Sequence, residues 1–231
     1  TNFVPTSQQT RTYSVKDGVS CESCHGPAEE WLEVHVSGTG THTDNLKAGM
    51  YAIEDPIKRA TVCMSCHIGT KDKFVDHRMI GAGHPRLTFE LDTYTAAEPA
   101  HFYPDNEYRK RKLIASSIQT WAIGQAMAVQ YIMQGIQDKK RFKKGVSPEF
   151  SYFDCNACHH PMSEKRWSPT ADLKRGPGIP RLNTSNLLML EVIASRVDKS
   201  LSKKLKAERI ALHQATLASE AETTTVAIEI I

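Results

Sequence analysis

Apolar residues repeat at every third or fourth position in two long stretches of the second half of the chain. In residues 106–140 the apolar positions are Ile114, Ile118, Trp121, Ala122, Ala126, Val129, Met133 and Ile136. In residues 184–219 they are Leu190, Ile193, Val197, Leu201, Leu205 and Leu212. This period matches a helical turn, so each stretch predicts one long amphipathic helix, and we expect the two to form a hairpin or bundle.

Shorter patterns predict the remaining elements. Asp55-Pro56 predicts the start of a short helix that runs into residues 63–67. Residues 38–45 are rich in Gly and Thr and predict a loop, with a solvated His42. Residues 87–104 predict an irregular segment with one short strand. The C-terminal TTTVAIEII, residues 223–231, predicts a strand or a partner contact because its residues are β-branched and apolar. We expect His213 to be exposed.

All six cysteines belong to three copies of one five-residue motif. The copies are Cys21-Glu22-Ser23-Cys24-His25, Cys63-Met64-Ser65-Cys66-His67 and Cys155-Asn156-Ala157-Cys158-His159. In this spacing two thiols can form thioethers to a porphyrin edge, and the adjacent imidazole lies beneath the iron as its fifth ligand. The sequence therefore predicts three covalently attached haem c groups, with His25, His67 and His159 as proximal iron ligands.

Two other readings of the cysteines explain less. A zinc site needs four ligands and would use two CxxC pairs, which leaves the third pair without a role. Three disulfides would account for the even number of cysteines but not for the histidine that follows each pair.

Further histidines are candidates for the opposite face of each iron. His77 and His84 follow the second motif, and we expect each to be the distal ligand of a different haem. Gly81 and Gly83 predict a loop after Arg78, which lets the two rings point apart. His35 lies too close to His25 in sequence to serve the same haem, so we expect it to bind a neighbouring iron, with a surface role as the alternative. His101 and His160 are reserve candidates.

Charge and hydropathy narrow the class of protein. The formal charge is +3 without cofactor, and six propionates would move it to about −3, so net charge gives no support for nucleic-acid binding. No stretch reaches the length of an apolar membrane span. Because haem is attached to this motif outside the bacterial cytoplasm, we expect a processed protein of the periplasm or the extracellular space.

The sequence resembles the cytochrome c-554 type of multihaem cytochrome, which is related to the hydroxylamine oxidoreductase lineage. The resemblance rests on GVSCESCHGPAEEWLEVH, residues 18–35, and on CMSCHIG with VDHRMIGAGHPRLTFELDTY and PAHFY, between residues 63 and 103. It implies a mainly α, haem-dense electron carrier with mostly bis-histidine irons, in which His77 and His84 match distal positions. Such proteins usually carry four or more haems, whereas this sequence has three motifs.

These observations predict an electron-transport cytochrome that exchanges single electrons with redox partner proteins and is not an enzyme. The alternative is a haem enzyme, or a subunit of one, acting on a small nitrogen or sulfur compound at a five-coordinate iron. We expect three segments: residues 1–104 with two haem motifs, residues 105–165 with a long helix and the third motif, and residues 166–231 with a Pro/Gly-rich connection and a helix. The long helices are expected to mediate assembly, as a homo-oligomer or within a larger cytochrome complex.

Overall fold

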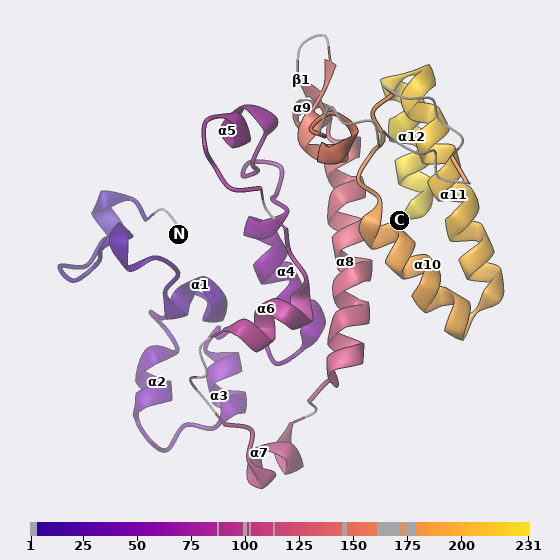
Figure 1. Cartoon of the computed structure of the whole chain (residues 1–231). Coiled ribbons are helices and arrows are strands. Elements are labelled where there is room, and N and C mark those ends of the chain that lie inside the picture. The colour runs from indigo at the N-terminus through magenta and orange to yellow at the C-terminus, as the bar shows by residue number, and fades with distance from the viewer. Residues whose placement is uncertain are drawn as a thin grey trace. The chain divides into compact units, whose positions relative to one another are not determined.

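The computed structural model describes residues 4–86, 88–98, 101, 103–112, 114–144, 147–160, 172–173 and 179–231. Regular structure in these residues is mainly helical (Figure 1), which confirms that the fold is mainly α. The haem-packed N-terminal part stays a prediction. Contacts divide the chain into two compact units. The first comprises residues 1–63 and 100–116, and the second comprises residues 64–99 and 117–231. The expected division into three consecutive segments stays a prediction.

The first unit is built from short helices. They are the 3-10 turns Thr6–Gln8 and Val15–Asp17, α1 (Cys21–His25), α2 (Leu32–Val36), α3 (His42–Lys47), α7 (Asn106–Arg111) and the first part of α4 (Pro56–His67). The predicted helix start at residue 56 is confirmed, since the Asp55 carboxylate accepts a hydrogen bond from the Ile57 N–H at 2.8 Å. Among the described residues of this unit, the buried apolar side chains are Trp31 and Ala60.

The loop expected over residues 38–45 is partly wrong, because α3 begins at His42. Thr41 and Asp44 form a capping box: the Thr41 hydroxyl accepts from the Asp44 N–H, and the Asp44 carboxylate accepts from the Thr41 N–H. His42 is half-buried rather than solvated, with its Nε2 2.7 Å from Glu54 Oε1.

The second unit is a helical bundle with a small sheet and several turns. Its helices are α5 (His77–Gly81), α6 (Leu91–Ala97), α8 (Ser117–Gln137), α9 (Lys139–Phe142), α10 (Ser185–Val197), α11 (Lys199–Ala218) and α12 (Glu220–Ile230). Strand β1 (Lys143–Lys144) pairs antiparallel with β2 (Ser147–Pro148), and 3-10 turns follow at Phe150–Tyr152 and Cys155–Ala157. In Figure 1, α8 packs beside α10 and α12, and α11 packs against both of these helices.

The single helix expected over residues 106–140 is wrong. Three helices occupy this stretch, with breaks after Arg111 and after Gln137. The second break forms because the Asp138 side chain accepts the Lys140 N–H and caps a new helix. The predicted apolar stripe is correct at Val129, Met133 and Ile136, which are buried, but Ile118 is 77% exposed.

Small residues explain how the buried face of α8 is rotated from the predicted stripe. A Cβ atom on Gly124 would lie 2.7 Å from the Leu91 Cβ of α6, and one on Gly135 would lie 2.2 Å from the Tyr152 hydroxyl. Glycine thus admits two close neighbours on a face that an apolar pattern does not mark.

The single helix expected over residues 184–219 is also wrong, because it folds back at Asp198 into α10 and α11. Asp198 has an extended backbone, and its carboxylate accepts hydrogen bonds from the N–H groups of Ser200 and Leu201. The resulting hairpin packs on α8, so the predicted bundle is confirmed. Val197 at the turn is 85% exposed, although it lies on the predicted stripe.

The expected C-terminal strand is wrong, since residues 220–230 form α12. The hydroxyl groups of Thr223 and Thr225 donate hydrogen bonds to the carbonyls of Ser219 and Ala221, four residues earlier. These threonines therefore make their polar contacts within a helix. Ala227 is fully buried in the core formed by residues of α8, α10 and α11. Tertiary packing of this apolar face outweighs the β propensity of its residues.

Two expectations for the loops around α5 and α6 also need correction. The loop after Arg78 begins later than expected, because α5 runs to Gly81 with Asp76 as its N-cap. The irregular segment 87–104 contains α6, whose first turn is capped by the Glu90 carboxylate.

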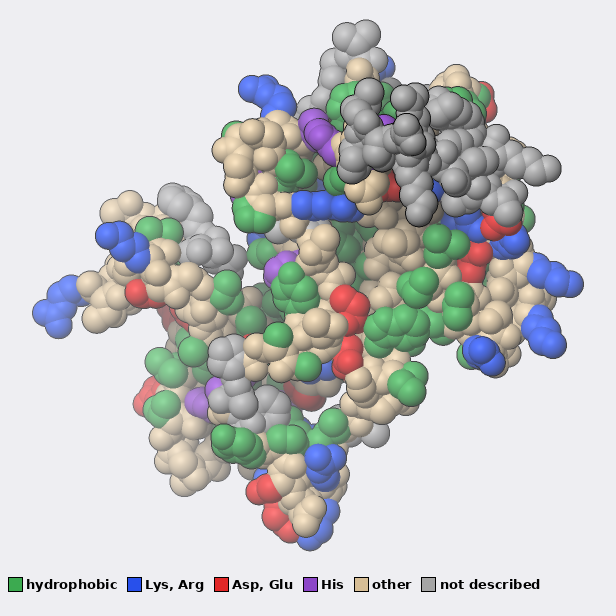
Figure 2. All heavy atoms as spheres, in the orientation of Figure 1, with side chains coloured by type: hydrophobic (Ala, Val, Ile, Leu, Met, Phe, Trp, Pro, Cys, Tyr) green, Lys and Arg blue, Asp and Glu red, His purple; other side chains and the backbone are tan. Residues whose placement is uncertain are grey.

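Exposed apolar side chains gather over α10 on the face shown in Figure 2. The exposed apolar residues of α10 include Leu188, Met189 and Val192, which are 40%, 40% and 52% exposed. The expectation that the long helices mediate assembly stays a prediction.

In the described part of the chain, no helix combines the length and apolar character that a bilayer span requires.

Replacing Asp198 with alanine is expected to lower the free energy of unfolding by about 1 kcal/mol, because two N–H groups at the start of α11 lose their acceptor. Urea denaturation measures the change. Lys199→Ala alters the next exposed residue without touching the cap and is expected to stay within about 0.5 kcal/mol of the parent. Equal effects of the two substitutions would contradict the capping role.

Candidate functional site

The first haem motif is a single helical turn. Cys21 and Cys24 lie in α1 with His25 as its last residue, and neither cysteine forms a disulfide. The turn ends at Gly26, whose φ is +83°. A Cβ atom there would lie 2.8 Å from the Tyr51 ring, so glycine allows this ring to close over the motif. The Tyr51 N–H also donates to the His25 carbonyl at 2.9 Å, which fixes the end of the turn.

The structure brings His101 rather than His35 to the ring of His25. The His25 and His101 ring centroids are 6.1 Å apart, with an interplanar angle of 85°. His35 is exposed, and its ring instead lies 5.9 Å from the buried indole of Trp31. The sequence marked His101 only as a reserve candidate. The role of His35 as a ligand of a neighbouring iron stays a prediction.

The second motif forms the last turns of α4. Cys63 and Cys66 are three residues apart in a continuous helix, so both thiols lie on one face. Lys73 Nζ donates to Cys66 Sγ at 3.1 Å. Burial raises the pKa of the Cys66 thiol, but the hydrogen bonds from Lys73 and Ser65 and the positive charge of Lys73 together outweigh burial, so the net shift is downward. Burial alone lowers the pKa of His67, which favours the neutral imidazole that binds a metal.

Aromatic side chains pack against the His67 ring. In the described part of the chain its ring neighbours are Phe89, stacked at 4.7 Å, and Tyr94, edge-on at 5.0 Å. A cavity of about 450 Å³ adjoins it and is lined by His67, Phe74, Arg86, Phe89, Gln125 and Arg141, among others. This volume falls within the roughly 300–1,000 Å³ of sites that hold cofactors. Sequence reasoning missed Phe89, Tyr94 and Arg141.

The third motif folds as a 3-10 turn over Cys155–Ala157. Asp154 caps it by accepting the Asn156 N–H, and Arg181 holds the same carboxylate at 2.8 Å. The His159 N–H donates to the Cys155 carbonyl at 2.7 Å, which turns His159 back over the motif.

His77 lies beside this third motif, although in sequence it follows the second motif. The ring centroids of His77 and His159 are 6.3 Å apart. His77 opens α5, and its backbone N–H donates to the buried Glu149 carboxylate at 2.7 Å. Glu149 also accepts the Ser151 N–H, so one carboxylate ties α5 to the turn that precedes Cys155.

His84 does not meet another ring among the described residues. It is exposed, and its Nδ1 lies 2.8 Å from the Pro85 carbonyl. Its predicted role as a distal ligand therefore stays a prediction.

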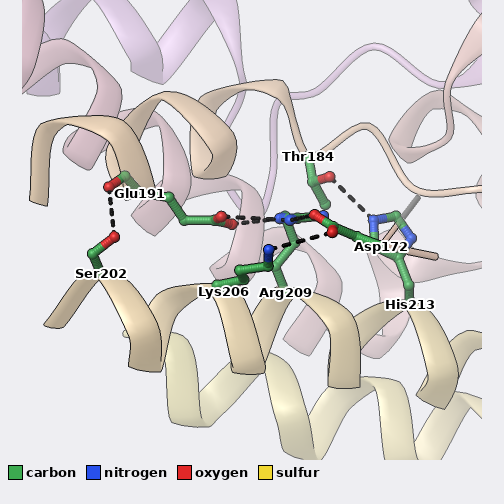
Figure 3. Close-up of polar contacts among 7 residues, drawn as sticks. All are labelled: Asp172, Thr184, Glu191, Ser202, Lys206, Arg209 and His213. Carbon is green, nitrogen blue, oxygen red and sulfur yellow. Dashed lines mark hydrogen bonds and ion pairs between the residues drawn. The ribbon is translucent and has the colours of Figure 1, made fainter. Parts of the chain in front are cut away.

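His213 is 1% exposed, so the expectation that it is exposed is wrong. Its Nε2 lies 3.1 Å from the Thr184 hydroxyl in the bundle core (Figure 3).

The two histidine pairs have the separation that a shared iron would need. A metal ion between two imidazoles on opposite faces of a flat cofactor lies about 2 Å from each nitrogen, which places the ring centroids roughly 6 Å apart. The pairs His25–His101 and His77–His159 lie at 6.1 and 6.3 Å. In each pair one member directly follows a CxxC pair, in the required spacing, whose cysteines form no disulfide. The donor sets therefore fit haem c.

Comparison with known proteins adds no further information. No family model matches the chain, and no similar curated protein or solved structure was found. Within the described residues, no group of three or more His, Cys, Asp or Glu side chains is arranged to hold a metal ion by itself.

Proposed function

We propose that the chain is a multihaem c-type cytochrome that passes single electrons between redox partner proteins outside the cytoplasm. Three haems are attached through Cys21 and Cys24, Cys63 and Cys66, and Cys155 and Cys158. Haem supplies the one-electron chemistry, and the chain holds each iron and sets its ligand field. The observation that carries the proposal is the separation of His25 from His101 and of His77 from His159.

Two bis-histidine irons suit a carrier. Two strong imidazole donors keep an iron low-spin in both oxidation states, so little rearranges when an electron passes. The modest apolar core of the first unit also supports the proposal, because a haem plate beside Trp31 would supply apolar surface that its described side chains provide only at Trp31 and Ala60.

A haem count with a spin-state spectrum tests the proposal. The purified protein is expected to show three haems by pyridine haemochrome analysis and by mass, and low-spin ferric signals from at least two of them. Cys66→Ser is expected to lose or weaken one covalent attachment. A chain that carries no haem after expression with a haem-attachment system would overturn the proposal.

A second function is favoured at one haem only. His67 packs against Phe89 and Tyr94 and adjoins a cavity with arginine side chains, whereas the other two proximal histidines each face a histidine. An iron bound there without a distal imidazole would admit a small ligand, which is the requirement for an enzyme acting on a small nitrogen or sulfur compound.

Replacing His84 with leucine separates these two functions. If His84 is a distal ligand, the parent protein is wholly low-spin, and His84→Leu turns one haem high-spin and raises its reduction potential through loss of an imidazole donor. Electron paramagnetic resonance measures the spin states. We expect this outcome for a pure carrier. A parent protein that already contains one high-spin haem, unchanged by His84→Leu, would favour the enzyme.

A further inference from the structure

Arg141 is a buried cation that no described carboxylate balances. It lies in α9, and its side chain is 4% exposed. Its Nη2 donates to the carbonyl of Ile68 at 3.3 Å, and its guanidinium lies 5.2 Å from the Phe74 ring centroid. Nε has no hydrogen-bond partner among the described residues, and no described acid lies within ion-pair distance. An unpaired buried charge is costly, so this position calls for an anion.

The neighbouring acids do not fill that role. Burial raises the pKa of Tyr152 to about 12, against the opposing effect of Arg141, so this phenol stays neutral. Glu149 accepts the N–H groups of His77 and Ser151 on Oε1, and it is not within ion-pair distance of Arg141. Glu90 lines the cavity, but its two oxygens cap α6.

The cavity that Arg141 shares with His67 is a place from which an anion could reach this guanidinium. Arg141 donates to Ile68, the residue directly after His67, and both His67 and Arg141 line the 450 Å³ space. Arg86 lines it as well, so the permanent charges among the described lining residues are those of Arg86, Arg141 and the engaged Glu90 carboxylate. A guanidinium is well suited to a carboxylate because its fork of N–H donors matches two oxygens.

We propose that Arg141 binds a propionate of the haem attached through Cys63 and Cys66. This inference rests on the proposed function and names the residue that holds one haem in its pocket and sets its charge. A cation held beside the propionate favours the reduced iron, because reduction removes one positive charge from the centre.

Potentiometric titration of Arg141→Gln tests the assignment. One of the three haems is expected to become about tenfold harder to reduce, a fall of about 59 mV in its potential, while the other two are unmoved. The matched control is Arg196→Gln, which removes the same charge from an exposed position of α10. Nuclear Overhauser contacts between haem methyl groups and Phe89 identify the affected haem. Three haems with potentials equal to those of the control would overturn the inference and leave the proposed function intact.

Two further experiments test a free anion as the alternative ligand and replace the first variant if it does not fold. If the anion were a free carboxylate or phosphate, the potential of this haem in the parent protein would depend on the concentration of added acetate or phosphate, and that dependence would overturn the propionate assignment. If Arg141→Gln does not accumulate, Arg141→Lys decides, because a single ammonium replaces the fork. The propionate band in the resonance Raman spectrum is expected to shift, and an unchanged band would count against the proposal.

Discussion

Replacing His101 with leucine is expected to convert one haem from low-spin to high-spin and leave the others unchanged. The His101 ring lies 6.1 Å from that of His25, the distance for two imidazoles on one iron. Leucine removes a strong nitrogen donor, so the ligand field at this iron weakens and its reduction potential rises. Electron paramagnetic resonance and redox titration measure the two effects.

His35→Leu is the matched control, because His35 lies in the same unit, is exposed and contacts Trp31 rather than His25. If His101 and not His35 binds the iron above His25, as the ring contacts indicate, His35→Leu keeps the low-spin signal of that haem. The reverse result, with a high-spin haem in His35→Leu and none in His101→Leu, would assign His35 to the iron and contradict the arrangement seen in the structure. His77→Leu provides the equivalent test at His159.

The sequence was most informative where chemistry is local. Each CxxCH motif spans five consecutive residues, so its two thiols and its histidine could be proposed as a haem site before any fold was known. The helix that starts at Pro56 was equally predictable, because Asp55 caps it and its last residue is His67 of the motif. Mainly helical structure followed from the apolar period of the second half of the chain.

Contacts between distant segments were beyond sequence reasoning. His77 follows the second motif in the chain but lies beside His159 of the third, because Glu149 binds the first N–H of α5. Sequence spacing assigns a histidine to the motif nearest to it in the chain and cannot show the contact between His77 and Glu149. In the sequence Arg141 is one of several basic residues at the end of an expected helix. Its exposed fraction of 4% in the structure distinguishes it from Lys139 and Lys140, which are exposed.

Helix breaks were missed for a related reason. The apolar period continues through Asp138 and Asp198, and a periodicity argument gives little weight to one polar residue. Each of these aspartates nevertheless binds N–H groups of the following turn and starts a new helix. An aspartate within a long apolar pattern was therefore the signal that could have revealed the turns.

The largest expected loss of stability comes from Arg209, which joins α10 and α11 in the core. Its Nε donates to the Glu191 carboxylate, and its Nη2 lies 3.1 Å from Asp172 (Figure 3). The Arg209 side chain is 4% exposed, and Lys206 also holds Asp172 at 3.3 Å. Burial lowers the pKa of this arginine, but its hydrogen bonds to Glu191 and Asp172 and the negative charges of these two carboxylates together outweigh burial, so the net shift is upward and Arg209 stays charged.

Replacing Arg209 with methionine is expected to lower the free energy of unfolding by about 3–5 kcal/mol, because Glu191 is left in the core without its cation. Urea denaturation followed by circular dichroism measures the loss. Arg196→Met changes an exposed arginine on α10 in the same way and is expected to cost less than about 0.5 kcal/mol.

A second substitution at Glu191 shows whether the loss comes from the unpaired carboxylate or from the packing of the side chain. With Glu191 changed to leucine in the Arg209→Met background, the core contains neither charge, and most of the lost stability is expected to return, since an apolar pair can replace a buried ion pair at little cost. If the double variant is as unstable as Arg209→Met, the loss comes from the packing of the Arg209 side chain between α10 and α11 and not from the unpaired carboxylate. If Arg209→Met is no less stable than Arg196→Met, the ion pair contributes nothing to the bundle.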